Sequence, residues 1–205
     1  MNYERLAFTD AIKKLQEDHG SRVAYEKMEQ GDRTDGLTQA EMEFISSRDS
    51  FYLGSIGENG YPYIQHRGGP KGFLSVLDDH TIGMVDFSGN KQYISVGNVM
   101  TNPRVSLFLM DYPLRARLKM YAEMRIVEIG DDPDLYRRLA PDGYKYKGER
   151  MLLFSVEAYS WNCPQHITPR YSIEEIEMAF AERNSYISRL EEEVKQLRAS
   201  KNGGE

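Results

Sequence analysis

Apolar residues in the first forty-eight positions recur at helical spacing. Phe8, Ile12 and Leu15 lie on one stripe of a predicted helix. Thr38 and Glu41 form a capping box, in which each side chain satisfies a backbone group at the start of a second helix. We therefore expect a helical N-terminal segment, residues 1–48, that contains two short helices.

From residue 51 onward the apolar period becomes two, which is typical of β-strands. Asn59-Gly60 predicts a hairpin turn with positive φ angles, and Pro133 suits the first turn of a short helix. The predicted strands occupy residues 51–57, 63–69, 73–79, 80–88, 104–112, 117–130 and 150–162. Because closure removes exposed strand edges, these short strands favour a mainly β fold with a closed antiparallel barrel of about six strands.

A helical spacing returns at Ser172, which forms a capping box with Glu175. Steps of three and four residues, interrupted by Arg183, join Ile173, Ile176, Phe180, Ile187, Leu190, Val194 and Leu197. So narrow a stripe does not hold a long helix by itself. Residues 172–205 should therefore form an amphipathic helix and tail that either pack on the barrel or pair with a partner helix.

The composition is that of a folded protein, and it limits the classes of partner that the protein can bind. Hydrophobic residues make up 40% of the 205 and aromatic residues 11%, which excludes a disordered chain. A formal net charge of -6 repels phosphate backbones, so we expect no nucleic-acid partner. The chain has neither a long apolar run nor the apolar region of a signal peptide, and its single cysteine excludes an intrachain disulfide. We expect a cytoplasmic protein that does not contact a membrane.

Three basic stretches are candidates for a site that takes an anion or a flat polar ring. QHRGGPKGFLSV (65–76) combines three glycines with Arg67 and Lys71, and SGNKQYISVGNV (88–99) combines glycines and amides with Lys91. In LRARLKMY, three basic residues project from one strand face. Each stretch alone fits turn geometry or a solvated surface. Together they favour a site, because an antiparallel barrel can bring successive strand ends to one rim.

A fourth stretch, SWNCPQHITPRY (160–171), holds the only Trp and the only Cys. Cys163 and His166 have the spacing of half a metal site, but no second pair completes it, so we predict no metal. The sequence does not show whether Cys163 or His166 is chemically active. Trp161 could stack on a planar ligand, although filling a core is the more frequent role of a lone Trp.

The order of these segments resembles the pyridoxamine 5'-phosphate oxidase-like family of flavin-binding split barrels. The resemblance runs from PYIQHRGGPKGFLSV through DFSGNKQYISVGNV, NPRVSLFLMDY and RLKMYAEMRIVE to WNCPQHITPRY. It implies a six-stranded antiparallel Greek-key split β-barrel at residues 49–171. It also implies a homodimer that binds FMN in clefts at the subunit interface.

The resemblance further implies which residues bind the cofactor, although it assigns no catalytic residue. Gln65, His66 and Arg67 would line the flavin, and Gly68 and Gly72 would admit its ring. The remaining positions are Asp86 at a strand end, Asn90, Lys91, Ser95 and Asn98 at the phosphate and ribityl chain, Arg117 from the partner subunit, and Trp161, Gln165 and Arg170 at the rim.

Two departures from the family pattern point away from vitamin B6 oxidation. The oxidase has an arginine three residues after the turn proline, where this chain has Gln65, and Lys91 stands alone in the phosphate loop. The hypothesis is a flavin-dependent oxidoreductase with another small-molecule substrate and an electron donor such as NADH or NADPH. The alternatives are a flavin-binding carrier or sensor without turnover, or a split barrel that uses FAD, haem or a deazaflavin.

Overall fold

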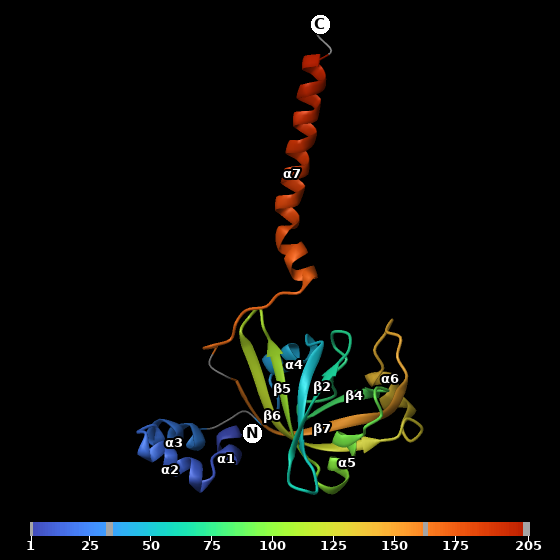
Figure 1. The fold of residues 1–205 in the computed structure, drawn as a ribbon. Helices are drawn as coiled ribbons and strands as arrows, with labels where there is room; N and C mark the ends of the chain where they lie inside the picture. The colour runs from blue at the N-terminus through green and yellow to red at the C-terminus, as the bar shows by residue number, and fades with distance from the viewer. Residues whose placement is uncertain (1, 32–34, 162–163, 203–205) are drawn as a thin grey trace. The chain divides into compact units, whose positions relative to one another are not determined.

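The computed structural model of the protein describes residues 2–31, 35–161 and 164–202, with the backbone alone at 199–202 (Figure 1). The chain divides into two compact units. The first unit combines residues 1–111 with 115–165, and the second combines 112–114 with 166–205. Each unit is described by itself.

Four helices precede the first strand, where the sequence predicted two. The predicted helices are present as α2 and α4, and the capping box of Thr38 and Glu41 is confirmed. The additional helices are α1 and α3. Their bounds are α1 Tyr3–Ala7, α2 Asp10–Asp18, α3 Arg22–Gln30 and α4 Gln39–Ser46.

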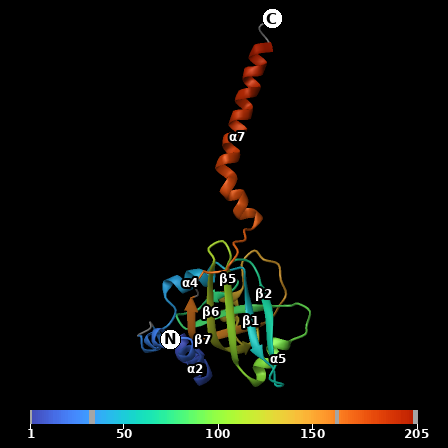
Figure 2. The same ribbon diagram turned by 60° about the vertical axis from the view of Figure 1, so that its left-hand side comes forward.

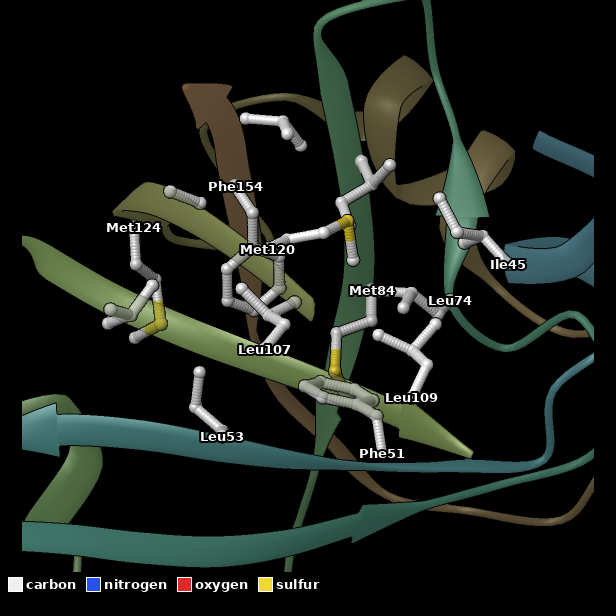
Figure 3. Packing of buried hydrophobic residues seen from close by; sticks show 14 of the residues in the cluster. Ile45, Phe51, Leu53, Leu74, Met84, Leu107, Leu109, Met120, Met124 and Phe154 are labelled. Atoms are coloured by element: carbon white, nitrogen blue, oxygen red, sulfur yellow. The ribbon is translucent and has the colours of Figure 1, made fainter. Parts of the chain in front are cut away.

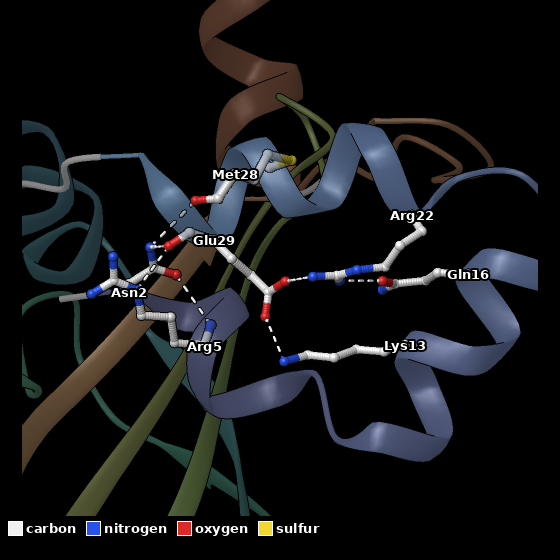
Figure 4. A network of polar contacts seen from close by, with 7 residues as sticks. All are labelled: Asn2, Arg5, Lys13, Gln16, Arg22, Met28 and Glu29. Atoms are coloured by element: carbon white, nitrogen blue, oxygen red, sulfur yellow. Dashed lines mark hydrogen bonds and ion pairs between the residues drawn. The ribbon is translucent and has the colours of Figure 1, made fainter.

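Polar contacts explain why the apolar pattern missed α1 and α3. Glu29 on α3 makes ion pairs with Arg22 and with Lys13, whose Nζ lies 3.2 Å from Oε1 (Figure 4). The carbonyl of Glu29 accepts hydrogen bonds from Asn2 Nδ2 at 3.1 Å and from Arg5 Nε at 2.7 Å. These helices are therefore held by charged and amide groups rather than by a continuous apolar stripe, which is the signal that periodicity detects.

Seven antiparallel strands form the sheet, and each of the seven predicted stretches overlaps one of them. The expected fold, a mainly antiparallel β structure with flanking helices, is confirmed. The strand bounds are β1 Ser50–Ile56, β2 Pro62–Gly68, β3 Ser75–Val76, β4 Thr81–Phe87, β5 Arg104–Asp111, β6 Ala116–Val127 and β7 Gly148–Trp161. The sheet thus has one strand more than the six expected, and β3 is only two residues long.

The order of neighbouring strands is β2-β1-β5-β6-β7-β4-β3. Figure 2 shows β2, β1, β5 and β6 side by side in this order. Hairpins join β1 to β2, β3 to β4 and β5 to β6, and the long β7 pairs with β6 on one side and β4 on the other. The ion pair between Arg67 on β2 and Asp86 on β4 joins the first strand of this order to the last but one. The sheet therefore curls far enough for its two ends to approach each other.

Local sequence signals mostly match the structure. Pro133 begins the short helix α6 Pro133–Leu139, which lies between β6 and β7. In the turn between β1 and β2, Gly60 has a φ of 80°. Asn59 does not share this conformation; its side chain accepts a hydrogen bond from the backbone of Tyr61. The prediction of two positive φ angles was therefore right for one residue of the pair.

The hydrophobic core fills the curled sheet (Figure 3). The ring of Phe51 lies 6.0 Å from that of Phe73 and 6.1 Å from that of Phe154, and all three side chains are buried. Met84 and Leu109 are buried in the same cluster. Large side chains from β1, β4, β5 and β7 thus interdigitate, and their burial provides the main driving force for folding.

The second unit contains the long helix α7, Ile173–Asn202. Its capping box is confirmed, because the backbone N–H of Ser172 donates to Glu175 at 2.8 Å and that of Glu175 donates to Ser172 Oγ at 3.2 Å. Among the helices that the structure describes, none has a stretch apolar and long enough to cross a membrane.

Candidate functional site

A pocket of about 180 Å³ lies where β2, β4 and the segment after β4 meet. That segment is a loop, residues 88–93, followed by helix α5, Ile94–Thr101. The lining combines cationic, amide, hydroxyl and aromatic side chains: Tyr63, Gln65, Arg67, Asp86, Phe87, Gly89, Asn90, Lys91, Gln92, Tyr93, Ile94, Ser95, Val96 and Glu149. Polar groups thus converge on one concave surface, as they do in small-molecule sites.

The loop at the rim of the pocket has a strained backbone. Lys91 has a φ of 59° and Tyr93 a φ of 54°, values that residues other than glycine rarely adopt. Asn90 supports the loop by accepting a hydrogen bond from the backbone of Gln92 at 3.1 Å. Strain of this kind concentrates at functional sites, and here it places Lys91 beside the N-terminal turn of α5.

Strand alternation selects which residues of β2 face the pocket. Tyr63, Gln65 and Arg67 are half-buried and line it, whereas the residues between them point to the other face of the strand. Gln65 accepts a hydrogen bond from Ser95 Oγ at 2.6 Å, which ties β2 to the first turn of α5. The amide nitrogen of Gln65 remains as a donor for a ligand.

A chain of ion pairs crosses the floor of the pocket. Arg67 Nη1 lies 2.5 Å from Asp86 Oδ1, and Arg150 on β7 lies 3.9 Å from the other oxygen of Asp86. Arg150 also pairs with Glu149 at 3.0 Å, and its guanidinium lies 5.0 Å from the ring centre of Tyr93. Arg67 Nε is buried and has no hydrogen-bond partner within the described residues. One cationic donor is therefore available beneath the pocket.

The surroundings of Glu149 hold its pKa below the usual value of a glutamate. A hydrogen bond from Ser88 lowers the pKa of Glu149 most, and the charges of Arg150 and Lys91 lower it further. The carboxylate attracts both cations and would compete with a bound phosphate for Lys91. Glu149 therefore limits how much positive charge the pocket offers.

The structure brings together six of the residues that the sequence proposed for the cofactor. These six line the pocket: Gln65, Arg67, Asp86, Asn90, Lys91 and Ser95. They come from two strands, the loop and one helix. Their role in binding a flavin is still a prediction, but their convergence is a structural fact.

Four further proposed residues lie near these elements but do not line the pocket. His66 packs its ring against Tyr52 on the outer face of the sheet, with ring centres 5.6 Å apart. Asn98 on α5 donates to Ser55 Oγ at 3.0 Å. A Cβ atom added at Gly68 would lie close to the ring of His66. Gly72 has a φ of 83°, and a Cβ atom added there would lie close to the carbonyl oxygen of Ser46. Neighbouring protein atoms and backbone geometry thus account for both glycines.

The other proposed residues lie on different parts of the chain. Arg117 on β6 places its guanidinium 5.7 Å from the ring centre of Phe108. Trp161, at the far end of β7, donates to Glu41 Oε1 at 2.6 Å. Gln165 is exposed, and Arg170 stacks on Tyr112 in the second unit. Cys163 lies outside the described residues, and His166 has a φ of 62°.

Sequence reasoning missed several lining residues, of which Tyr63, Phe87, Tyr93 and Glu149 are the most distinctive. Tyr63 could have been found from strand alternation, because it shares a face with Gln65 and Arg67. Glu149 has no such signal. It reaches the pocket only because β7 pairs with β4, a contact between residues far apart in the sequence.

The chain is similar to several solved structures. HupZ of Group A Streptococcus gives a TM-score of 0.50 at 14% identity, over 66% of this chain and 99% of that chain. A putative pyridoxamine 5'-phosphate oxidase from Lactobacillus delbrueckii gives 0.48 at 19% identity, over 62% and 96%. An FMN-binding protein from Syntrophomonas wolfei gives 0.45 at 15% identity, over 73% and 97%.

Identities this low concern the fold alone, and no curated protein matches the sequence. The family itself rests on a direct match of the sequence. Residues 37–158, more than half of the chain, match the sequence profile described as pyridoxamine 5'-phosphate oxidase, and the chain therefore belongs to this family.

Proposed function

We propose that the pocket between β2, β4 and α5 binds the phosphate-bearing part of FMN and that the protein is a flavin-dependent oxidoreductase. The observation that carries the proposal is the convergence of Lys91, the first turn of α5 and Arg67, with its buried Nε, on one concave surface. A helix N-terminus presents backbone N–H groups and a partial positive charge, which suit a phosphate.

The donors in the pocket fit such a ligand. Lys91 and the N–H groups at the start of α5 would hold the phosphate, while Ser95 and Asn90 would contact the ribityl hydroxyls. Gln65 and Arg67 on the β2 wall would donate to the polar edge of the flavin ring. The buried Nε of Arg67 supports this assignment, because an unpaired buried donor is costly until a ligand accepts from it.

The size of the pocket supports a homodimer. At about 180 Å³ it is smaller than the roughly 300–1,000 Å³ typical of sites that enclose a ligand of this size. A second copy would supply the missing wall, with Arg117 of the partner among the residues that contact the flavin. The proposal thus includes a pair of Greek-key split barrels, in which the two-residue β3 is an addition to six longer strands.

When bound, FMN supplies the redox chemistry, and the protein binds and orients it. Asp86 keeps Arg67 in place and neutralises part of its charge. The substrate is a small molecule other than pyridoxamine phosphate, and the electron donor is NADH or NADPH.

The absorbance spectrum of the purified protein, with added FMN, tests the proposal. We expect a yellow protein, or saturable FMN uptake, and bleaching of the flavin band on addition of NADH or NADPH. FMN binding without reduction by either nucleotide would favour the carrier or sensor. A haem or deazaflavin spectrum, release of FAD rather than FMN on denaturation of the protein, or no chromophore and no FMN uptake, would overturn the proposal of FMN.

A further inference from the structure

Helix α7 carries an apolar seam, interrupted once, that is exposed in the single chain. Seven of the eight positions at three- and four-residue steps are apolar: Ile173, Ile176, Phe180, Ile187, Leu190, Val194 and Leu197, with Arg183 as the exception. Their exposed fractions run from 40% at Phe180 to 71% at Ile173. The helix has 30 residues and is about 45 Å long. Exposing an apolar seam of this length to water is unfavourable in free energy.

The seam follows a heptad repeat through the whole helix. If Ile173 is an a position, then Phe180, Ile187 and Val194 are also a positions, and Ile176, Leu190 and Leu197 are d positions. Three of the four a residues are β-branched, and two of the four d residues are leucine. This distribution favours two parallel strands over three or four.

The flanking charges match a second copy of the same helix. In a parallel pair, a g residue faces the e residue of the following heptad on the other helix. Glu193 is a g residue and Arg198 is an e residue, so each helix places its glutamate opposite the arginine of the other. An apolar groove along Ile187, Leu190 and Val194, bordered by Arg198, lies on this side of α7.

Arg183 is the one charged residue in the seam. Its guanidinium lies 4.0 Å from the ring centre of Phe180, one turn earlier on the same helix. The side chain therefore runs along the helix surface, and its charged end can reach the edge of the seam. A single charged seam position lowers stability but favours the two-stranded state, in which that end stays in contact with water.

From these observations we propose that α7 is an interaction surface for a second copy of this chain, and that the two helices form a parallel, in-register coiled coil. The seam shares no residue with the lining of the candidate pocket, and the pairing does not depend on the proposed function.

Cysteine cross-linking in the full-length protein tests the pairing and its direction. In a Cys163→Ser background, Leu190→Cys places one thiol on each helix at the same d layer, within the distance a disulfide can span. Ser188→Cys is the matched control, since position 188 lies on the outer face of the repeat. We expect mild oxidation to give a covalent dimer with Leu190→Cys while the control stays mostly monomeric.

Reversing the flanking charges provides a second test on the same cross-link. Glu193→Arg should slow the cross-link of Leu190→Cys, because it places two arginines opposite each other. Adding Arg198→Glu should restore it. Equal cross-linking at positions 190 and 188, or none at 190, would overturn the proposal. So would a cross-link that forms only with a partner carrying Ile187→Cys, which would indicate antiparallel helices.

Discussion

Asp86 makes ion pairs with arginines from two different strands of the first unit. It is 4% exposed and faces Arg67 from β2 and Arg150 from β7. Because β2 and β4 are not adjacent in the sheet, the Arg67–Asp86 pair also fastens the two approaching ends of the sheet. This residue therefore affects stability as well as the shape of the pocket.

Replacing Asp86 by alanine should lower the free energy of unfolding by about 3 kcal/mol, because a buried arginine loses its partner. Urea denaturation measures this loss. The matched control is Asp134→Ala, which breaks an exposed pair with Arg137 on α6. That change should cost no more than about 1 kcal/mol. Similar losses in the two variants would show that the Arg67–Asp86 pair does not support the fold.

Residues of β2 show what a sequence pattern can and cannot reveal about a site. Gln65 and Arg67 line the pocket, whereas His66 between them packs on Tyr52. Consecutive residues of a strand point to opposite faces, so one pocket in one chain cannot use all three. Strand alternation alone would have separated His66 from its neighbours. By contrast, the buried donor of Arg67 became visible only with the structure.

At the level of elements, His80 connects parts of the chain that are far apart in sequence. Its Nδ1 lies 2.9 Å from Asp79 in the turn before β4, and its Nε2 lies 3.2 Å from Asp35, ahead of α4. Nearby, the backbone of Leu37 donates to the carbonyl of Asp79 at 2.6 Å. The N-terminal segment is thus attached to the β3–β4 hairpin partly through this histidine.

This attachment should make stability depend on pH. The hydrogen bond to Asp79, followed by that to Asp35, raises the pKa of His80. The protonated form is therefore favoured in the folded state. Its stabilising effect is complete below the unfolded pKa, about 6.5, and is lost as the pH rises through the raised folded value.

Urea unfolding of wild type and His80→Gln across this pH range measures the effect. The wild-type protein should lose stability relative to His80→Gln as the pH rises. The control His19→Gln, at an exposed histidine after α2, should follow the wild type. A constant difference between wild type and His80→Gln at all pH values would contradict this account.

Helices and strands differed in how well the sequence predicted them. All seven strand stretches were found, because a half-buried strand leaves an alternating pattern. Helix α3 was missed because Glu29, Arg22 and Lys13 hold it through charges. Strand β3 was predicted too long, since only Ser75–Val76 pair with β4. The spacing of apolar residues shows neither the polar contacts between distant residues nor how many residues of a strand pair with its neighbour.

For the whole molecule, the sequence predicted the family and the class of fold but not the layout of the site. The pocket depends on the sheet curling until β2 approaches β4, and on β7 bringing Glu149 beside Lys91. Both are long-range contacts. Several residues on β2 and in the loop were found, although Tyr63 and Tyr93 were missed there. Glu149 comes from a distant strand and had no local signal.

Flavin fluorescence during titration with FMN tests the central claim most directly. The comparison is between the wild type, Lys91→Gln at the pocket and the control Lys71→Gln, an exposed lysine outside the lining. We predict saturable binding by the wild type and the control, and binding about tenfold weaker in Lys91→Gln because a charge-assisted contact to the phosphate is lost. Equal affinity in all three proteins, or no saturable binding by the wild type, would contradict the assignment of this pocket to FMN.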